Sequence, residues 1–324
     1  MPIRGLVIGK FYPPHRGHKL LIDTARTRVD ELHVIVCDQP GEAPPASLRG
    51  EWLREIHPDA RVLVVEDRYD PHDSALWADL THGWLGFAPD VVFTSEDYGE
   101  RFARYLGCRH VQVDKARAAV PISGTQVRAD PLGCWEYLEP LVRAYYCRRV
   151  VLVGAESTGK TTLAAALARE LATVWVPEFG REYSERRGVR GWTSDEFVLI
   201  ARKQCEMEND GARRANRVLV CDTDAFATAV WHRRYMGCRS AEVEAVAAAH
   251  RRPDLYLLTD VATPFVQDGT RDGEHVRDWM HRAFVEDLTA TGRRFVELAG
   301  PPDARLSAAL AAVRSLGCAL SRDV

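Results

Sequence analysis

The chain has 324 residues, which is enough for two domains that each bury a core of their own. Hydrophobic residues make up 46% of it, and its 43 basic side chains nearly balance its 46 acidic ones, which speaks against nucleic acid as the main partner. No apolar run approaches the roughly 20 residues that a membrane-spanning helix needs, so no membrane partner is expected. The eight cysteines form no C-x-x-C pair, so we expect a cytoplasmic protein without a zinc site or disulfide framework.

Apolar runs alternate with amphipathic stretches along the chain, a pattern typical of βα units around a parallel sheet. The sequence therefore predicts an α/β fold with two domains, both built on parallel sheets, of which the first is Rossmann-like. In the first domain, strands are expected at residues 5–8, 32–37, 61–65, 91–94 and 110–113. Helical patterns between them include residues 51–56 and 98–106.

The boundary between the domains is predicted near residue 147. A helical stretch from residue 134 to about 146 ends the first domain, and an apolar strand at 149–153 begins the second with almost no linker. The expected domains are 1–147 and 148–324. Later strands of the second domain are expected at residues 174–176, 218–221, 255–258 and 295–298.

A glycine-rich loop with two histidines follows the first predicted strand. It reads GKFYPPHRGH, from Gly9, Lys10 and Phe11 to His15 and His18. The histidines are three residues apart, so they fall on one side of the first helical turn. Protonated, or as neutral N–H donors, they can bind phosphate oxygens and stabilise a pentacoordinate phosphorus, which predicts a catalytic role. A metal site is the alternative, but no third ligand is evident.

A second motif, ISGTQVR at residues 122–128, lies near the end of the first domain. Ser123 and Thr125 can cap a helix whose N–H groups face an anion, and Arg128 follows one turn later. Taken alone, the motif would be a helix N-cap. Together with the histidine loop, it predicts the second wall of a site for the triphosphate of ATP.

The segment GAESTGKT at residues 154–161 satisfies the P-loop pattern G-x-x-x-x-G-K-[ST] between an apolar strand and a predicted helix at 161–171. The backbone N–H groups of such a loop surround phosphate oxygens. Lys160 is expected to reach the β- and γ-phosphates during catalysis, and Thr161 to ligate Mg²⁺. The predicted ATP-binding residues of this segment are Gly154, Glu156, Ser157, Thr158, Gly159, Thr161 and Thr162.

An apolar strand ends in Asp222, which is suited to hold Mg²⁺. The alternative role for Asp222 is to cap the next helix, and Thr223 or Asp224 could provide that cap instead. A kinase that acts on a hydroxyl also needs a carboxylate to accept the hydroxyl proton. Glu178, which follows the second strand of this domain, and Asp224 are the two candidates for that base.

Two further predictions concern loops of the second domain. Arg181 and Glu182 follow Glu178 and are expected to contact substrate, with salt-bridged surface residues as the alternative. The segment 267–273 reads QDGTRDG, which suits a lid that brings Arg271 onto the γ-phosphate of ATP. An ordinary exposed loop would have a similar composition.

The motifs and their order resemble a known family. GKFYPPHRGH and ISGTQVR resemble the HxGH nucleotidyltransferase superfamily. With VVLVGAESTGKTTLA directly behind them, and PEFGREY and CDTDAFAT further on, the whole chain is similar to NadR-type bifunctional proteins. By this resemblance, the segments Arg49 to Trp52 and Thr94 to Tyr98 lie where the family contacts the nucleotide or the nicotinamide, although these matches are looser.

The resemblance implies two reactions. A ribosylnicotinamide kinase forms nicotinamide mononucleotide and ADP, and an adenylyltransferase converts the mononucleotide and ATP to NAD and pyrophosphate, with Mg²⁺ as cofactor. Some members begin with a helix-turn-helix repressor domain, but here the first strand begins at the third residue, so DNA-binding regulation is not expected. The sequence leaves homo-oligomer formation open.

Two rival interpretations stay open at this point. One keeps the fold and changes the substrates, as in another HxGH nucleotidyltransferase fused to a nucleoside kinase. The other is a nucleotide sensor with one inactive half, against which the intact histidine pair and P-loop argue.

Overall fold

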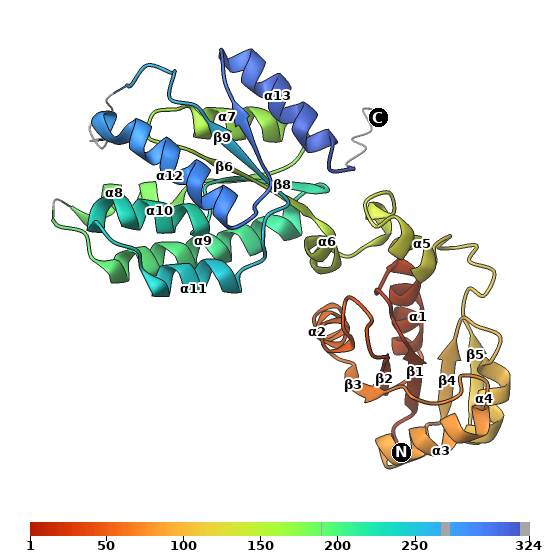
Figure 1. Ribbon diagram of the computed structural model, residues 1–324. Helices are drawn as coiled ribbons and strands as arrows, with labels where there is room; N and C mark the ends of the chain where they lie inside the picture. Colours follow the sequence, from red (N-terminus) through yellow and green to blue (C-terminus); the bar gives the residue numbers. More distant parts are fainter. Residues whose placement is uncertain (189, 267–272, 318–324) are drawn as a thin grey trace. The chain divides into compact units, whose positions relative to one another are not determined.

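The computed structural model describes residues 1–188, 190–266 and 273–317. The chain forms two compact units, Met1–Val142 and Arg143–Val324. Each unit has a five-stranded sheet whose paired strands are all parallel (Figure 1). The predicted class, two α/β domains on parallel sheets, is confirmed.

The sheet of the first unit has the strand order β3-β2-β1-β4-β5. Its strands are β1 (Arg4–Gly9), β2 (Glu31–Asp38), β3 (Arg61–Glu66), β4 (Val91–Thr94) and β5 (Arg109–Gln112). Its helices are α1 (Arg16–Arg26), α2 (Ala46–Ile56), α3 (Ser74–Leu85), α4 (Gly99–Leu106) and α5 (Gly124–Ala129), followed by a 3₁₀ turn η1 (Trp135–Tyr137). Helix α6 (Pro140–Tyr146) ends this part of the chain.

Two apolar clusters cover the two faces of this sheet. Successive side chains of a strand point to opposite faces, so Val7 of β1 joins the cluster under α1 and α2, whereas Leu6 and Ile8 join the cluster under α3 and α4. Burial on both faces explains why β1 and β2 read as almost unbroken apolar runs. The helices show one apolar stripe each; in α1 the stripe includes Leu21 and Ile22.

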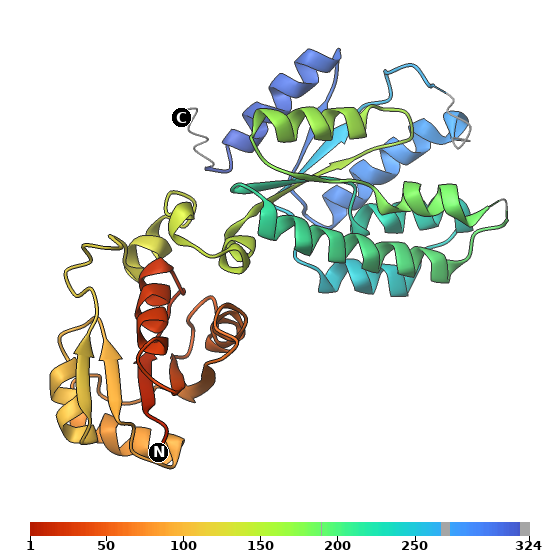
Figure 2. The ribbon, with the colours of Figure 1, turned by 180° about the vertical axis from the view of Figure 1, so that it is seen from behind.

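The second unit has the strand order β10-β9-β6-β8-β7. Its strands are β6 (Arg148–Val153), β7 (Trp175–Val176), β8 (Val218–Asp222), β9 (Leu255–Thr259) and β10 (Phe295–Leu298). Its helices are α7 (Lys160–Glu170), α8 (Phe179–Arg187), α9 (Ser194–Arg214), α10 (Ala225–Met236), α11 (Ala241–Ala249), the 3₁₀ turn η2 (Glu274–Val276), α12 (Arg277–Ala290) and α13 (Pro302–Arg314). Helices α7 and α13 lie together on one face of the sheet, and α9 to α12 lie on the other (Figure 2).

The strand order reverses once in each sheet, beside the strand that comes first in the chain. In the first unit β1 lies between β2 and β4, and in the second unit β6 lies between β8 and β9. Loops that leave the carboxyl ends of such neighbouring strands diverge to opposite faces and leave a crevice between them, where ligands bind. The histidine loop follows β1 and the P-loop follows β6, so both predicted motifs lie at these points.

The division between the two units falls inside α6, a few residues before the boundary near 147 that the sequence predicts. The Arg251 side chain explains this position. Its guanidinium donates to the carbonyl of Ala144 over 3.2 Å and also to the carbonyl of Tyr145. The last turn of α6 is thereby tied to the second unit.

We expect residues 1–142 and 143–324 to fold separately, because each unit has its own sheet and core. Thermal melts of the two fragments should each show one cooperative transition. A fragment that begins at 148 should melt at a lower temperature than one that begins at 143, because Arg251 loses the carbonyls it binds. Non-cooperative melting of both fragments would show that the units share a core.

Candidate active sites

A cavity of about 560 Å³ lies in the first unit and includes the loops that follow β1 and β4. The residues predicted from the sequence that line it are Gly9, Lys10, Phe11, His18, Tyr98, Ser123, Thr125 and Arg128. The histidine loop and the ISGTQVR motif, which are far apart in the chain, therefore share one cavity.

The two histidines begin helix α1. His15 is its N-cap and stacks on His18, with ring centroids 3.7 Å apart. The N–H of Gly17 donates to His15 Nδ1 over 3.1 Å, and the N–H of His15 donates to His18 Nδ1 over 3.3 Å. Because each Nδ1 accepts a hydrogen bond, the ring proton of each neutral histidine is on Nε2.

Burial keeps both rings neutral at pH 7. It lowers the pKa of His15 to about 4, and the positive charge of Arg117 acts in the same direction. Burial also lowers the pKa of His18 well below its ordinary value, with smaller effects of His15 and Arg117. Of the two protonation states that the sequence left open, the structure favours neutral rings, each with an Nε2–H donor.

The ISGTQVR motif meets the histidine loop through Tyr12. Arg128 donates to the carbonyl of Tyr12 over 2.6 Å and to Thr125 Oγ1 over 3.0 Å, and its guanidinium lies over the Tyr12 ring. A Cβ at Gly124 would lie 2.7 Å from the Tyr12 carbonyl, so glycine is required for this approach. Ser123 caps α5 by accepting from the N–H of Gln126 over 3.3 Å.

Arg49 and Trp52 are buried in α2 and are not among the residues that line the cavity. Arg49 donates to the carbonyl of Lys10 and pairs with Glu42 at 2.6 Å, so its charge holds the histidine loop in place. Tyr98 lines the cavity and donates to the carbonyl of Ile8 over 3.2 Å.

Among the residues of this cavity that the sequence interpretation missed are Asp67, Trp77 and Arg117. Asp67 is 7% exposed, and its carboxylate makes no hydrogen bond within the described part of the chain. It directly follows β3, and a polar residue that ends a strand at this edge is a signal that could have found it. Trp77 and Arg117 carry no such signal, because they lie in a helix and a loop whose contacts only the fold decides.

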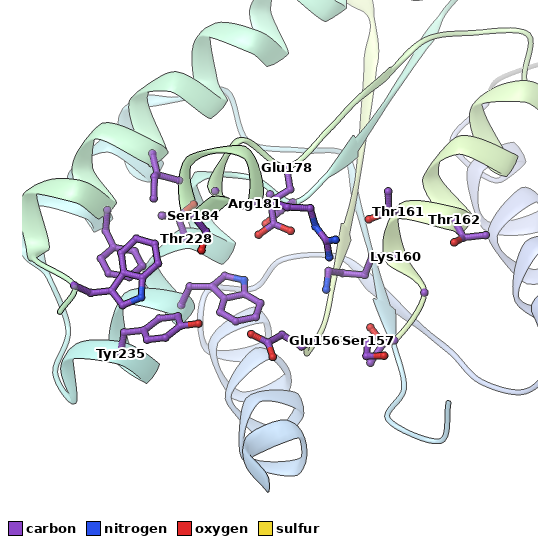
Figure 3. Close-up of a pocket in the computed structure, with 18 residues that line it drawn as sticks. Glu156, Ser157, Lys160, Thr161, Thr162, Glu178, Arg181, Ser184, Thr228 and Tyr235 are labelled. Carbon is purple, nitrogen blue, oxygen red and sulfur yellow. The ribbon is translucent and has the colours of Figure 1, made fainter. Parts of the chain in front are cut away.

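A second cavity, of about 160 Å³, lies beside the P-loop in the second unit. The predicted residues that line it are Glu156, Ser157, Thr158, Gly159, Lys160, Thr161, Thr162, Glu178 and Arg181. Figure 3 shows the Arg181 side chain extending from beside Glu178 toward Lys160. The P-loop and the loop after β7 therefore face one another across this cavity.

The P-loop needs its glycines because its backbone passes close to β9. Gly154 has φ 142°, and a Cβ there would lie 2.4 Å from Thr259 Oγ1. Gly159 has φ 84°, which disfavours other residues. Lys160 Nζ donates to the carbonyls of Gly154 and Ala155 over 3.0 and 2.8 Å, so its charge is held within the loop.

Asp222 and Thr161 fit a magnesium site. Thr161 Oγ1 donates to Asp222 Oδ2 over 2.5 Å. Asp222 is 1% exposed, and its Oδ1 has no hydrogen-bond partner among the described residues. A buried carboxylate oxygen without a partner, next to a P-loop hydroxyl, is a donor set that Mg²⁺ accepts.

The two candidate bases differ sharply in their surroundings. Asp224 caps α10: its Oδ1 accepts from the N–H of Ala227 over 2.8 Å, and its Oδ2 accepts from the Tyr256 hydroxyl over 2.6 Å. Both of its oxygens therefore have structural partners. Glu178 lines the cavity, its carboxylate makes no hydrogen bond with a described residue, and burial raises its pKa to about 7 against the opposing charge of Lys160.

Glu182 is not among the described residues that line the cavity. Glu182 pairs with Arg186 one turn along α8 at 2.7 Å and remains 45% exposed, as in the alternative role considered from the sequence. Arg271 and the rest of 267–272 lie outside the described residues. On either side of that segment, the N–H groups of Val266 and Gly273 donate to Ser157 Oγ and Glu156 Oε2, at 2.8 and 2.9 Å.

Aromatic side chains form the far wall of this cavity, and the sequence interpretation missed them. Trp192, Phe197, Trp231 and Tyr235 all line it. Tyr235 lies 5.2 Å from Trp192 and stacks at 6.4 Å on Trp231, measured between ring centroids. The Arg234 guanidinium lies 4.4 Å from the centroid of the Tyr235 ring, so a cation already contacts this wall.

Two families match separate parts of the chain. A family described as "Cytidylyltransferase-like" matches residues 6–130, and a family described as "AAA domain" matches residues 149–305. Each match lies inside one of the two compact units.

Curated relatives extend the similarity over both units. The "Trifunctional NAD biosynthesis/regulator protein NadR" of Escherichia coli (strain K12) is 31% identical over 327 residues, which cover 91% of this chain and 78% of that protein. The chain belongs to the NadR family. NadR of Salmonella typhimurium (strain LT2) has the same identity and coverage. The resemblance to NadR-type proteins that the motifs predict is confirmed.

Solved NadR structures share the fold of this chain. "Crystal structure of NadR protein in complex with NR" has a TM-score of 0.82 at 23% identity and covers 97% of this chain and 96% of that one. "Crystal structure of NadR protein in complex with NAD and AMP-PNP" has a TM-score of 0.80 at 21% identity, with coverages of 100% and 99%. In the described part of this NadR-family chain, no helix has the length and apolar character needed to cross a membrane.

The contrast between Glu178 and Asp224 predicts two different mutant phenotypes. Glu178→Gln should lower ADP release with ribosylnicotinamide about 10²–10⁴-fold, while the affinity for ATP changes little. In the unmutated protein, kcat/KM should rise with pH through about 7, because the base acts in its ionised form above its pKa. Asp224→Asn, the matched control, should lower Tm and retain most of the turnover. Near-native turnover of Glu178→Gln would remove Glu178 as the base.

Proposed function

We propose that this NadR-family chain makes NAD in two steps at two sites. The second unit phosphorylates ribosylnicotinamide with ATP, and the first unit joins the resulting nicotinamide mononucleotide to the adenylyl group of another ATP. The observation that carries the proposal is that the two cavities are equipped for different nucleophiles. The NadR relatives are described as NAD biosynthesis proteins, and the similar solved structures as complexes with NR, NAD and AMP-PNP.

In the kinase step, the attacking ribose hydroxyl is neutral and must lose its proton. Glu178 lines the cavity of the second unit and accepts that proton as the hydroxyl oxygen attacks the γ-phosphorus of ATP. The bond between the γ-phosphorus and the bridging oxygen breaks, and ADP leaves. Lys160 and Arg181 line the same cavity and supply positive charge for the transferred phosphoryl group.

Asp222 and Thr161 would hold the Mg²⁺ of this site through the oxygens described above. When bound, the metal neutralises charge on the phosphates of ATP. The buried carboxylate and the hydroxyl also keep each other oriented, because one donates to the other.

The aromatic wall suits the pyridinium ring of ribosylnicotinamide, which is planar and positively charged. Trp231 and Tyr235 line the cavity and stack on each other, and the faces of aromatic rings attract cations. The Arg234 guanidinium, which already lies over the Tyr235 ring, is paired with Glu156 at 2.7 Å. A neutral nucleoside would gain stacking but not the electrostatic attraction.

In the adenylyl step, the nucleophile is the phosphate of the mononucleotide, whose second pKa is about 6 and which is already ionised at pH 7. No base is required. A phosphate oxygen attacks the α-phosphorus of ATP, and the bond to the β-phosphate breaks, which releases pyrophosphate. The Nε2–H groups of the neutral His15 and His18 donate hydrogen bonds to the negative charge that develops on the phosphates.

Because ATP is the common substrate, we place the protein in the cytoplasm.

The two activities should be separable by mutation, because each cavity has its own phosphate-binding residues. Lys160→Ala should abolish phosphorylation of ribosylnicotinamide and leave the conversion of the mononucleotide to NAD largely intact. His18→Ala should have the opposite effect, with a loss of about 10²–10³ in turnover. The measurements are ADP release and NAD formation on the same preparations.

A folded variant in which either substitution silences both activities would contradict the two-site proposal. Measuring ADP release with neutral nucleosides in place of ribosylnicotinamide separates this proposal from that of a general nucleoside kinase, which would phosphorylate them as well. Turnover by either half also excludes a sensor function without catalysis for that half.

Asp67 should favour an amidated pyridine over an acidic one. Its buried carboxylate lines the first cavity together with Trp77, so a carboxamide can donate to it, whereas the carboxylate of nicotinic acid mononucleotide is repelled. Asp67→Asn should reduce the kcat/KM preference for the amide about tenfold or more. Asp70→Asn is the control, because Asp70 is exposed and not among the cavity-lining residues. An unchanged preference in Asp67→Asn would remove Asp67 as the selecting residue.

A further inference from the structure

The loop after β5 is held by one carboxylate. Asp114 accepts hydrogen bonds from three successive backbone N–H groups, those of Ala118, Ala119 and Val120, over 2.8, 3.1 and 3.1 Å. These bonds lower the pKa of Asp114. One carboxylate thereby bridges three successive backbone groups of the loop.

Arg117 lies within this loop and in a strained conformation. Its φ is 53°, and that of Asp114 is 45°, a region that non-glycine residues rarely adopt. Strain of this kind persists where the surrounding structure holds it, and it gathers at functional sites. Arg117 is among the residues that line the 560 Å³ cavity.

The cations that line this cavity in the described chain differ in how firmly they are held. Arg128 donates to the Tyr12 carbonyl and to Thr125, and Lys10 binds Gln39 and Glu42. Within the described residues, Arg117 forms one ion pair, 3.3 Å long, with Glu96, and both side chains are about half exposed, at 49% and 57%.

The position of Arg117 relative to the histidines is also defined. Its charge lowers the pKa of His15 and of His18, so it lies within electrostatic reach of both rings. Glu96, which follows β4, lines the same cavity.

We propose that Arg117 binds the phosphates that react beside His15 and His18, and that Glu96 competes with those phosphates for its guanidinium. The inference rests on the proposed adenylyl transfer and adds to it a cation and a counter-ion.

The chemistry of the step needs such a cation. Two neutral histidines offer N–H donors but no net charge, whereas negative charge moves onto pyrophosphate as the bond to the α-phosphorus breaks. A guanidinium can bind two phosphate oxygens at once, and it stays charged at any pH of interest. Arg117 supplies this charge from the loop that Asp114 holds.

The test is a kinetic comparison on the full chain. Arg117→Ala should lower kcat for NAD formation about 10²-fold, with a smaller change in KM for the mononucleotide, and Arg117→Lys should recover part of the loss. Lys115→Ala is the matched control, because Lys115 lies on the same loop, pairs with Asp97 and is not among the cavity-lining residues. It should stay within about twofold of the unmutated protein.

Glu96→Gln tests the role of the counter-ion, and its expected effect on phosphate binding is opposite to that of Arg117→Ala. Removing the competing carboxylate should lower KM for the phosphate substrate about two- to fivefold, as the loss of an exposed ion pair allows. Asp114→Ala should reproduce part of the Arg117→Ala defect. ADP release by the second unit, measured on the same preparations, should not change in any of these variants.

The outcomes are distinguishable. An unmutated chain that forms no NAD overturns the proposed function and this inference with it. An unmutated chain that forms NAD, with an Arg117→Ala variant equal to it, overturns the inference alone. A loss of NAD formation and of ADP release together in Arg117→Ala marks a folding defect and overturns the assignment of Arg117 to phosphate binding. An increase of KM in Glu96→Gln overturns the role of Glu96.

Discussion

Both sites depend on one constraint, the close approach of backbone segments where the strand order of a parallel sheet reverses. At that point a loop must pass near a neighbouring strand or loop before its helix begins. In the first unit, Gly124 allows the ISGTQVR segment to contact the Tyr12 carbonyl, and in the second unit Gly154 allows the P-loop to contact Thr259. A side chain at Gly124 would push the ISGTQVR segment away from the histidine loop, and one at Gly154 would push the P-loop away from β9.

Burial shifts the pKa values of the key groups at the two sites in opposite directions, although the physical cause is the same. Removal from water disfavours the charged form of any group, so it lowers the pKa of a histidine and raises that of a carboxylic acid. His15 and His18 become neutral donors for a nucleophile that is already ionised, and Glu178 acquires a pKa of about 7, near the value at which a base works best at neutral pH.

Several buried polar groups in these units hold backbone. Arg49 binds the histidine loop, Arg251 binds the end of α6, and Asp224 caps α10. Other buried oxygens, among them Asp222 Oδ1 and Glu208 Oε1, have no hydrogen-bond partner among the described residues. Asp222 Oδ1 and the carboxylate of Asp67 lie at the two sites where a metal ion and a pyridine amide are proposed.

The sequence alone determined the fold class, the order of the two units and the phosphate-binding loops, because these follow from local patterns. The strand-loop-helix contexts of Gly9–His18 and of the P-loop are continuous in the chain, and the apolar runs reflect strands buried on both faces. Only the tertiary structure determined which residues that are distant in the chain share a cavity or a hydrogen bond. It paired Asp224 with the Tyr256 hydroxyl, kept Arg49 and Glu182 out of the cavities, and brought Arg117, Trp77 and the aromatic wall into them. A hydrogen-bond partner or a cavity wall can come from any part of the chain, so no local pattern specifies it, whereas periodicity specifies the elements themselves.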